Sequence, residues 1–436
     1  MRRKQTSLIG CLLVCLVSVT TACSPSVDRE ASQNPGVTVF EGARLIVGDG
    51  TEPIEDAAFV VDDERFIAVG RRGELQVPAG AARVDLTGKT VMPTLVDLHA
   101  HLRGSREEYV DGLERQAYFG VGAILDIGSP ADRSADLRSN PLPGAALYRD
   151  GGRGIRGPDD REAGVMNEAD ARRVVQEHAA QKVDMIKIYV DDRYGEVKTL
   201  TPPMYRALID EANMHGLRAY AHIRFLRDAK ELLQAGLHGF AHCVRDQLID
   251  DEFVSLMKAR PDVFLVPTLP PRGVLPDLSW IEDTYQPEAF EEVQKEARTG
   301  TTPLAFGLQR PREPFAIQAA NLMRLKQEGV KIGLGTDINV GWAAHIEMED
   351  MVMAGMTPAD VIVAATGSSA EILRLADHGT VAPGKSASFI VLDANPLDQI
   401  TNTQRINQVY IRGTAVDRAA LRARWTDKAW RRSPNS

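Results

Sequence analysis

The chain has 436 residues, 44% hydrophobic and 25% charged, which is typical of a globular protein with a large core. This length allows two or three average domains or one large barrel. The formal net charge is −9, and without Arg2, Arg3 and Lys4 it becomes −12, with 48 basic and 60 acidic residues. An acidic surface repels phosphate groups, so the charge argues against nucleic acid and anionic membrane surfaces as partners.

The first 22 residues read as an export signal. Arg2, Arg3 and Lys4 precede an apolar run over residues 8–19, which is too short to span a membrane stably. Cys23 follows small residues and resembles the lipidated cysteine of a bacterial lipoprotein. Residues 23–36 are polar and contain proline and glycine, as a flexible tether would. We therefore expect a periplasm-facing lipoprotein that meets the membrane only through this anchor. Thr20 is not the usual Leu or Val, which leaves a soluble periplasmic protein as the alternative.

Short alternating segments at both ends of the remaining chain predict β-strands. The first group lies in residues 37–90 and includes Val37–Phe40, Ala58–Val61 and Arg65–Val69. The second group lies in residues 380–415 and includes Ser388–Leu392 and Gln408–Ile411. We expect the two groups to pair into one small sheet module beside the middle of the chain, with residues 416–436 as a C-terminal tail.

Residues 91–379 alternate between apolar strands and helices. The candidate strands are Val91–Asp97, Val121–Ile127, Ala145–Tyr148, Met185–Val190, Arg218–His222, Gly239–His242, Val263–Thr268 and Lys331–Asp337. Near-continuous apolar runs are typical of parallel strands covered on both faces. Eight such units fit a (β/α)8 TIM barrel, whose active site lies at the carboxyl ends of the strands. About 45 residues after the seventh strand form a long connection, for which an active-site cover and a neutral surface insertion are both open interpretations.

Chemistry-bearing residues fall on the predicted strand ends. His99 and His101 are two residues apart, so both imidazoles face the same side of a strand. His-x-His alone is a weak metal signal, but His222, His242 and Asp337 end later strands of the same barrel. Lys187 lies within an apolar strand, where an unpaired ammonium is costly. These six residues therefore predict a site at the mouth of the barrel.

Two longer segments resemble the amidohydrolase superfamily. Residues 91–101 are close to its first-strand motif, and residues 379–393 look like its return into a small β-sandwich. The resemblance spans residues 37–415 and is greatest to the imidazolonepropionase-related subgroup, which includes prolidase-like dipeptidases. It implies a (β/α)8 barrel with a small β-sandwich domain built from both chain ends.

The resemblance also implies a metal centre. His99 and His101 match ligands of the more buried ion, and His222 and His242 match ligands of a second ion. Lys187 matches a lysine that is carboxylated by CO2 and bridges two divalent ions, and chemistry agrees because an ammonium has no lone pair for a cation. Zinc is the default for histidine-rich sites, and other divalent ions stay open. In the implied mechanism a metal-bridging hydroxide attacks a carbonyl carbon, and Asp337 binds metal and transfers protons.

The sequence departs from the subgroup around its substrate contacts. Tyr189 and the residues after it replace a Gly/Ser-rich segment, and Arg224 follows His222 where small residues are usual. Arg156 and Arg193 are further arginines near the mouth that match a substrate carboxylate. His345 corresponds to a His-x-Glu element of the subgroup. We expect Tyr189, Arg224 and His345 as substrate contacts, although surface or structural roles are alternatives.

Three functions are therefore considered. The first is a binuclear hydrolase of an amide or peptide-like C–N bond in a small substrate, such as a dipeptide or N-acyl amino acid. The second is a mononuclear deaminase or cyclic-amide hydrolase like imidazolonepropionase, which Lys187 disfavours. The third is an inactive ligand-binding lipoprotein, which predicts lost ligands, whereas all six positions are filled. The sequence does not decide between a monomer and a homo-oligomer.

Overall fold

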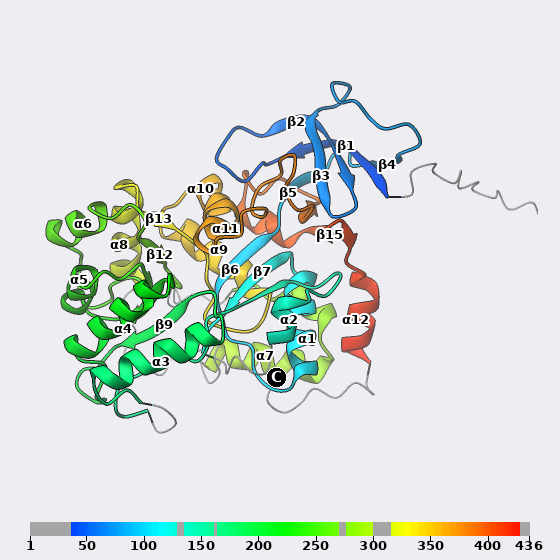
Figure 1. Ribbon diagram of the computed structural model, residues 1–436. Helices are drawn as coiled ribbons and strands as arrows, with labels where there is room; N and C mark the ends of the chain where they lie inside the picture. Colours follow the sequence, from blue (N-terminus) through cyan, green and yellow to red (C-terminus); the bar gives the residue numbers. More distant parts are fainter. Residues whose placement is uncertain (1–35, 129–134, 161–163, 270–275, 300–314, 428–436) are drawn as a thin grey trace, which may run out of the picture.

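The computed structural model describes residues 36–128, 135–160, 164–269, 276–299 and 315–427 (Figure 1). The predictions for the export signal, for Cys23 and for nearly all of the tether lie outside these residues. Among the described helices, none combines the length and the apolar character that crossing a membrane requires.

Strands from both ends of the chain form one predominantly antiparallel sheet (Figure 1). Its order is β16-β15-β14-β5-β1-β2-β3, and β4 pairs with β1. Phe389 in β14 lies opposite Pro93 in β5, so the expected pairing of the two ends is confirmed. The strands are β1 (Val37–Leu45), β2 (Ile54–Asp62), β3 (Arg65–Arg71), β4 (Ala82–Asp85), β5 (Thr90–Pro93), β14 (Phe389–Leu392), β15 (Ile406–Ile411) and β16 (Thr414–Ala415).

Aromatic rings fill one face of this sheet. Phe40 stacks on Phe59 with ring centres 5.0 Å apart, and Phe389 stacks on Tyr410 at 4.5 Å. Phe66 contacts both Phe59 and Phe389. Alternation in the strands places these rings on the same side, which explains why short strands from distant segments form a stable module.

The eight strands predicted in the middle of the chain are all present and parallel. They are β6 (Leu95–Ala100), β7 (Val121–Asp126), β8 (Leu147–Asp150), β9 (Ile186–Val190), β10 (Ala219–Ile223), β11 (Gly239–Ala241), β12 (Phe264–Val266) and β13 (Lys331–Ile332). They form sheets of three strands, β6-β7-β8, and five strands, β13-β12-β11-β10-β9. The edges of the two sheets adjoin on both sides, because the Leu98 amide donates to Leu334 at 2.9 Å and the Ile155 amide donates to Lys187 at 2.8 Å.

The run predicted as one strand over residues 91–97 is divided, which corrects the expectation. β5 belongs to the antiparallel sheet, whereas β6 starts the parallel strands at Leu95. The Thr94 amide donates to Ser388, and the next amide, that of Leu95, donates to Gly120. Both halves are apolar and buried, so the hydrophobic pattern carries no sign of the change of partner.

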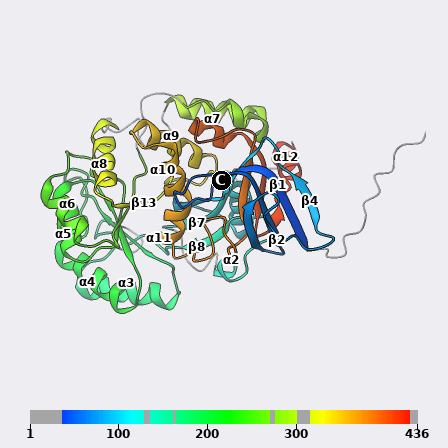
Figure 2. The same ribbon diagram turned by 90° about the horizontal axis from the view of Figure 1, so that it is seen from above.

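Helices cover the outside of the parallel strands (Figure 2). Two of these helices begin with a threonine followed by a proline, at Thr201–Pro202 and at Thr357–Pro358, and the Thr357 hydroxyl accepts a hydrogen bond from the Asp360 amide. The helices are α1 (Arg106–Tyr118), α2 (Ala135–Ser139), α3 (Glu168–Ala180), α4 (Pro202–Met214), α5 (Leu226–Gln234), α6 (Asp251–Lys258), α8 (Phe315–Gln327), α9 (Ala343–Met353), α10 (Pro358–Val363) and α11 (Ser369–Ile372). A π-helical turn, η4 (Ala364–Ser368), joins the last two.

The long connection after the seventh parallel strand is partly helical. Its described part contains η2 (Ser279–Thr284) and α7 (Pro287–Thr299). Ile281 and Tyr285 join one apolar cluster with Tyr118, Trp342 and Trp425. The described part is therefore folded against the molecule, while the role of an active-site cover stays a prediction.

The segment expected as a C-terminal tail contains helix α12 (Arg418–Thr426). Leu421 and Trp425 lie on one face of it, and Trp425 is buried with its indole nitrogen 2.7 Å from Asp111. The spacing of these two apolar residues is four, which is the signal that sequence reasoning missed.

Candidate functional site

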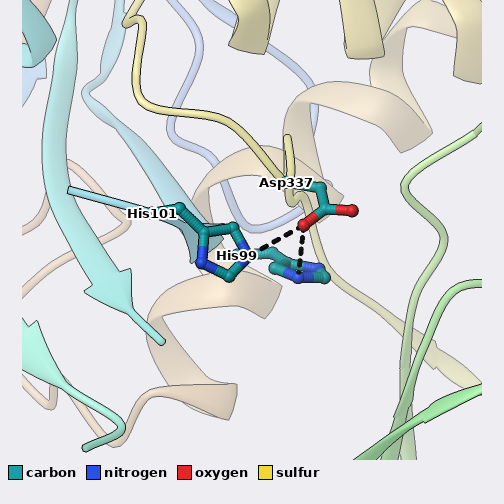
Figure 3. Close-up of side chains that lie close together, drawn as sticks. All are labelled: His99, His101 and Asp337. Atoms are coloured by element: carbon teal, nitrogen blue, oxygen red, sulfur yellow. Dashed lines mark hydrogen bonds and ion pairs between the residues drawn. The ribbon is translucent and has the colours of Figure 1, made fainter. Parts of the chain in front are cut away.

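The two histidines of the predicted first-strand motif converge on Asp337. His99 is the penultimate residue of β6 and is buried, and its Nε2 lies 3.0 Å from Oδ1 of Asp337. His101 follows β6, and its Nε2 lies 2.8 Å from the same oxygen. Figure 3 shows both imidazoles pointing toward this carboxylate. The three side chains offer ligand atoms that all lie within 4.8 Å of one another, close enough to hold one ion.

The backbone around Asp337 is held in an unusual conformation. Its φ is +61°, in the left-handed region, where Asp is tolerated better than most residues. The Asp337 amide donates to the carbonyl of His99, which ties the loop after β13 to the end of β6. His242 also has a positive φ of 73°. Such conformations persist where surrounding contacts over-determine them, and they gather at functional sites.

Lys187 is the second residue of β9 and is fully buried. Its Nζ lies 3.1 Å from Nε2 of His99 and 4.6 Å from the centre of the Tyr220 ring. No described carboxylate forms an ion pair with it, and burial lowers its pKa to about 7. The surroundings therefore disfavour an ammonium at the point where the resemblance expects a carboxylated lysine.

His222 and His242 lie next to each other at the ends of β10 and β11. Their ring centres are 4.6 Å apart, and the His242 ring is 5.2 Å from that of His99. Nε2 of His242 lies 3.8 Å from Oδ2 of Asp337, beyond hydrogen-bond distance. Both ring nitrogens of His242 are buried, and neither has a hydrogen-bond partner among the described residues.

This donor set fits a divalent cation. Burying an imidazole without hydrogen-bond partners costs free energy, unless a bound ligand such as a metal ion supplies the missing partner. Burial lowers the pKa of His99 to about 3 and of His222 to about 4, so both rings are neutral and able to ligate. The structure thus brings the six predicted side chains together, while their role as ligands stays a prediction.

Asp97 holds two segments of the site together through hydrogen bonds, and it was not predicted from the sequence. Its Oδ1 accepts hydrogen bonds from the backbone amides of His99 and Thr336, and its Oδ2 accepts from the Thr336 hydroxyl at 2.7 Å. The carboxyl is buried, and burial raises its pKa to about 6. Asp97 therefore ties β6 to the loop that carries Asp337. An acid within an apolar strand was the available signal.

Asp191 is the second residue that sequence reasoning missed. It follows β9, and its Oδ2 lies 3.2 Å from Nε2 of His222. Its Oδ1 lies 3.1 Å from Nε of Arg224, and both partners are at least half-buried. A carboxylate that binds one ring nitrogen of a metal-binding histidine orients the ring and makes the other nitrogen a better ligand.

Replacing Asp191 with Asn is therefore expected to weaken binding of a second divalent ion about 10- to 100-fold, because the amide no longer carries the charge that holds the His222 ring. Zinc titration of the apoprotein, followed by calorimetry, measures this. Asp192→Asn is the matched control, since Asp192 pairs with Arg227 rather than with a histidine. Equal zinc affinity in both variants would contradict the role given to Asp191.

The three predicted substrate contacts lie in different surroundings. His345 is fully buried, and its ring nitrogens lie 2.9 Å from the Phe119 carbonyl and 2.9 Å from the Thr403 hydroxyl. The structure therefore does not bring His345 to the metal-site side chains, and its contacts are those of a structural histidine. Arg224 is buried in its ion pair with Asp191. Tyr189 is half-buried and stacks on His222 with ring centres 5.3 Å apart.

Comparisons with known proteins identify related sequences. Residues 155–416 match the model of the amidohydrolase family. An imidazolonepropionase from Streptomyces griseus subsp. griseus is 26% identical over 374 residues, which cover 80% of this chain and 89% of the relative.

Solved structures share the architecture. A putative prolidase from Bifidobacterium longum is similar with a TM-score of 0.72 and 24% identity, covering 88% of this chain and 98% of the other. A Xaa-Pro dipeptidase with bound methionine in its active site gives a TM-score of 0.69 and 20% identity, covering 87% and 99%. These likenesses show the fold, which is an α/β fold of the TIM-barrel type.

Proposed function

The chain belongs to the amidohydrolase family of C–N bond hydrolases, and we propose that it cleaves an amide or peptide-like bond of a small substrate with the help of two divalent ions. The observation that carries this proposal is that His99 and His101 both contact the Asp337 carboxylate and that Lys187 contacts His99. The unpartnered nitrogens of the adjacent His242 support a second ion.

The proposed ligands divide into two groups. His99 and His101 would hold one ion, His222 and His242 the other, and a carboxylated Lys187 together with Asp337 would contribute oxygens. Bound divalent ions lower the pKa of water and polarise a carbonyl group, which is the chemistry they would supply here. Zinc is the proposed metal, because neutral imidazoles dominate the donor set.

The protein residues position the reaction and move its protons. Oδ1 of Asp337 faces both first-strand imidazoles, and Asp97 and the His99 carbonyl hold the loop that carries it. A carboxylate at this position is suited to accept the proton of the attacking water and to deliver it to the departing nitrogen. Lys187 is fully buried, so bulk water has little access to this part of the site.

A dipeptide or N-acyl amino acid is the proposed substrate type. The likeness to a Xaa-Pro dipeptidase structure supports it. The likeness to imidazolonepropionases favours hydrolysis of a cyclic amide as the second candidate. The two differ in substrate and in metal count, since Lys187 has a bridging role only with two ions.

The test combines metal content with a substrate panel. The purified protein is expected to contain about two zinc ions per chain by elemental analysis and to hydrolyse members of a panel of dipeptides, N-acyl amino acids and imidazolone propionate. Chelation of the metal is expected to abolish this activity, and added zinc to restore it, because the protein side chains alone cannot activate water sufficiently. Hydrolysis that survives complete metal removal would contradict the proposal.

A further inference from the structure

The three arginines predicted near the mouth of the site, Arg156, Arg193 and Arg224, have different partners. Arg224 is buried, and its Nε lies 3.1 and 3.2 Å from the two carboxylate oxygens of Asp191. Its charge is therefore already neutralised within the protein. Arg193 is exposed and lies in a turn with a φ of +51°. Arg224 is therefore engaged by a carboxylate of the protein, and Arg193 is exposed to solvent.

Arg156 has different surroundings. Its guanidinium carbon lies 3.5 Å from the centre of the Tyr189 ring. The same ring stacks on His222 with an interplanar angle of 28°. Tyr189 follows Lys187 by two positions on β9, so both side chains point to the same side of the strand. Arg156 and His222 therefore both lie against the Tyr189 ring, which places the guanidinium next to the histidine cluster.

The backbone that carries Arg156 is fixed to the same strand. The Ile155 amide donates to the Lys187 carbonyl at 2.8 Å, and the Tyr189 amide donates to the Ile155 carbonyl at 3.0 Å. This pair of bonds holds the position before Arg156 in register with Lys187 and Tyr189. A cation above an aromatic face is also attracted by the ring, which restricts the guanidinium further.

The guanidinium of Arg156 can still donate hydrogen bonds to a bound ligand, because its side chain is partly exposed to solvent. Its side chain is 43% exposed. Among the described residues, the carboxylate that approaches it is that of Asp160, with Oδ2 3.6 Å from Nε, longer than the ~2.7–2.9 Å of a charge-assisted hydrogen bond. The rigid fork of a guanidinium matches the two oxygens of a carboxylate or a similar planar anion.

We propose that Arg156 binds a carboxylate of the substrate, with Tyr189 holding the guanidinium over the site, so that the enzyme selects anionic substrates over neutral amides. This inference rests on the proposed function, because it assigns the group that accompanies the cleaved C–N bond. Arg156 is a specificity-determining residue that takes no part in the bond-breaking step.

The test compares acids with their amides in metal-loaded enzyme. The probe pairs are N-acetyl-leucine with N-acetyl-leucinamide, and alanyl-leucine with alanyl-leucinamide. The unmodified enzyme is expected to prefer the acid of each pair, in KM and in calorimetric binding. Arg156→Met is expected to raise KM for the acid about 10- to 100-fold with little change in kcat, and to leave KM for the amide nearly unchanged. Arg156→Lys is expected to recover part of the preference, and Arg193→Met to retain all of it.

The outcomes separate this inference from the proposed function. Cleavage of acids and amides with equal kcat/KM would overturn the role of Arg156 and leave C–N hydrolysis in place. Preferential binding of the acids without cleavage of any probe would support Arg156 and count against hydrolysis of this substrate type. A full acid preference in Arg156→Met, or the absence of any binding and cleavage in the unmodified enzyme, would overturn the assignment.

Discussion

Replacing Lys187 with alanine is expected to lower kcat/KM at least about 100-fold and to remove one or both divalent ions from the protein. Even the outer partners of metal ligands affect metal binding or activity 10- to 100-fold, and Lys187 lies inside the cluster, 3.1 Å from His99. Activity assays together with elemental analysis of the same preparation measure both effects.

The buried position of Lys187 explains why the loss is expected to be specific. An alanine there leaves an apolar cavity next to Tyr220, so thermal unfolding must show that the variant is folded. Lys198→Ala is the matched control, because Lys198 is exposed in the connection that follows the same strand. Undiminished activity with two ions retained in Lys187→Ala would exclude the carboxylated lysine.

The candidate ligands could be predicted from the sequence because each follows from local geometry. His99 and His101 are two residues apart at a strand end, so alternation places both on one side. His222, His242 and Asp337 follow apolar strands in the same way, and parallel strands present their carboxyl ends at the same edge. For these residues a strand pattern and a position within it were sufficient.

The remaining features depend on partners that are distant in sequence. Asp191 acquires its role from His222 and Arg224, which lie on the neighbouring strand and its loop. His345 is occupied by the carbonyl of Phe119, 226 positions away, and no local pattern distinguishes such a buried histidine from a substrate contact. Likewise, the chain changes sheet between β5 and β6 because the Thr94 amide donates to the Ser388 carbonyl, whereas the Leu95 amide donates to the Gly120 carbonyl.

Replacing Asp337 with asparagine is expected to lower kcat about 10²- to 10⁴-fold, the range for a residue that transfers protons in the reaction. Asparagine suits the experiment because it keeps the volume of the side chain and tolerates the left-handed backbone at φ +61°, so little strain is added. Pre-steady-state and steady-state rates on the best substrate of the panel, with metal content determined in parallel, measure the effect.

The size of this loss distinguishes proton transfer from metal retention. The amide oxygen of asparagine can still approach His99 and His101, whereas its nitrogen cannot accept a proton from water. A variant that retains both ions and loses kcat therefore assigns Asp337 to proton transfer, and a variant whose activity recovers fully with excess zinc assigns it to metal binding alone. Asp192→Asn controls for the loss of one carboxylate near the mouth. A kcat within tenfold of the unmodified enzyme would show that another group moves the proton, and Asp97, behind the same loop, would be the next to replace.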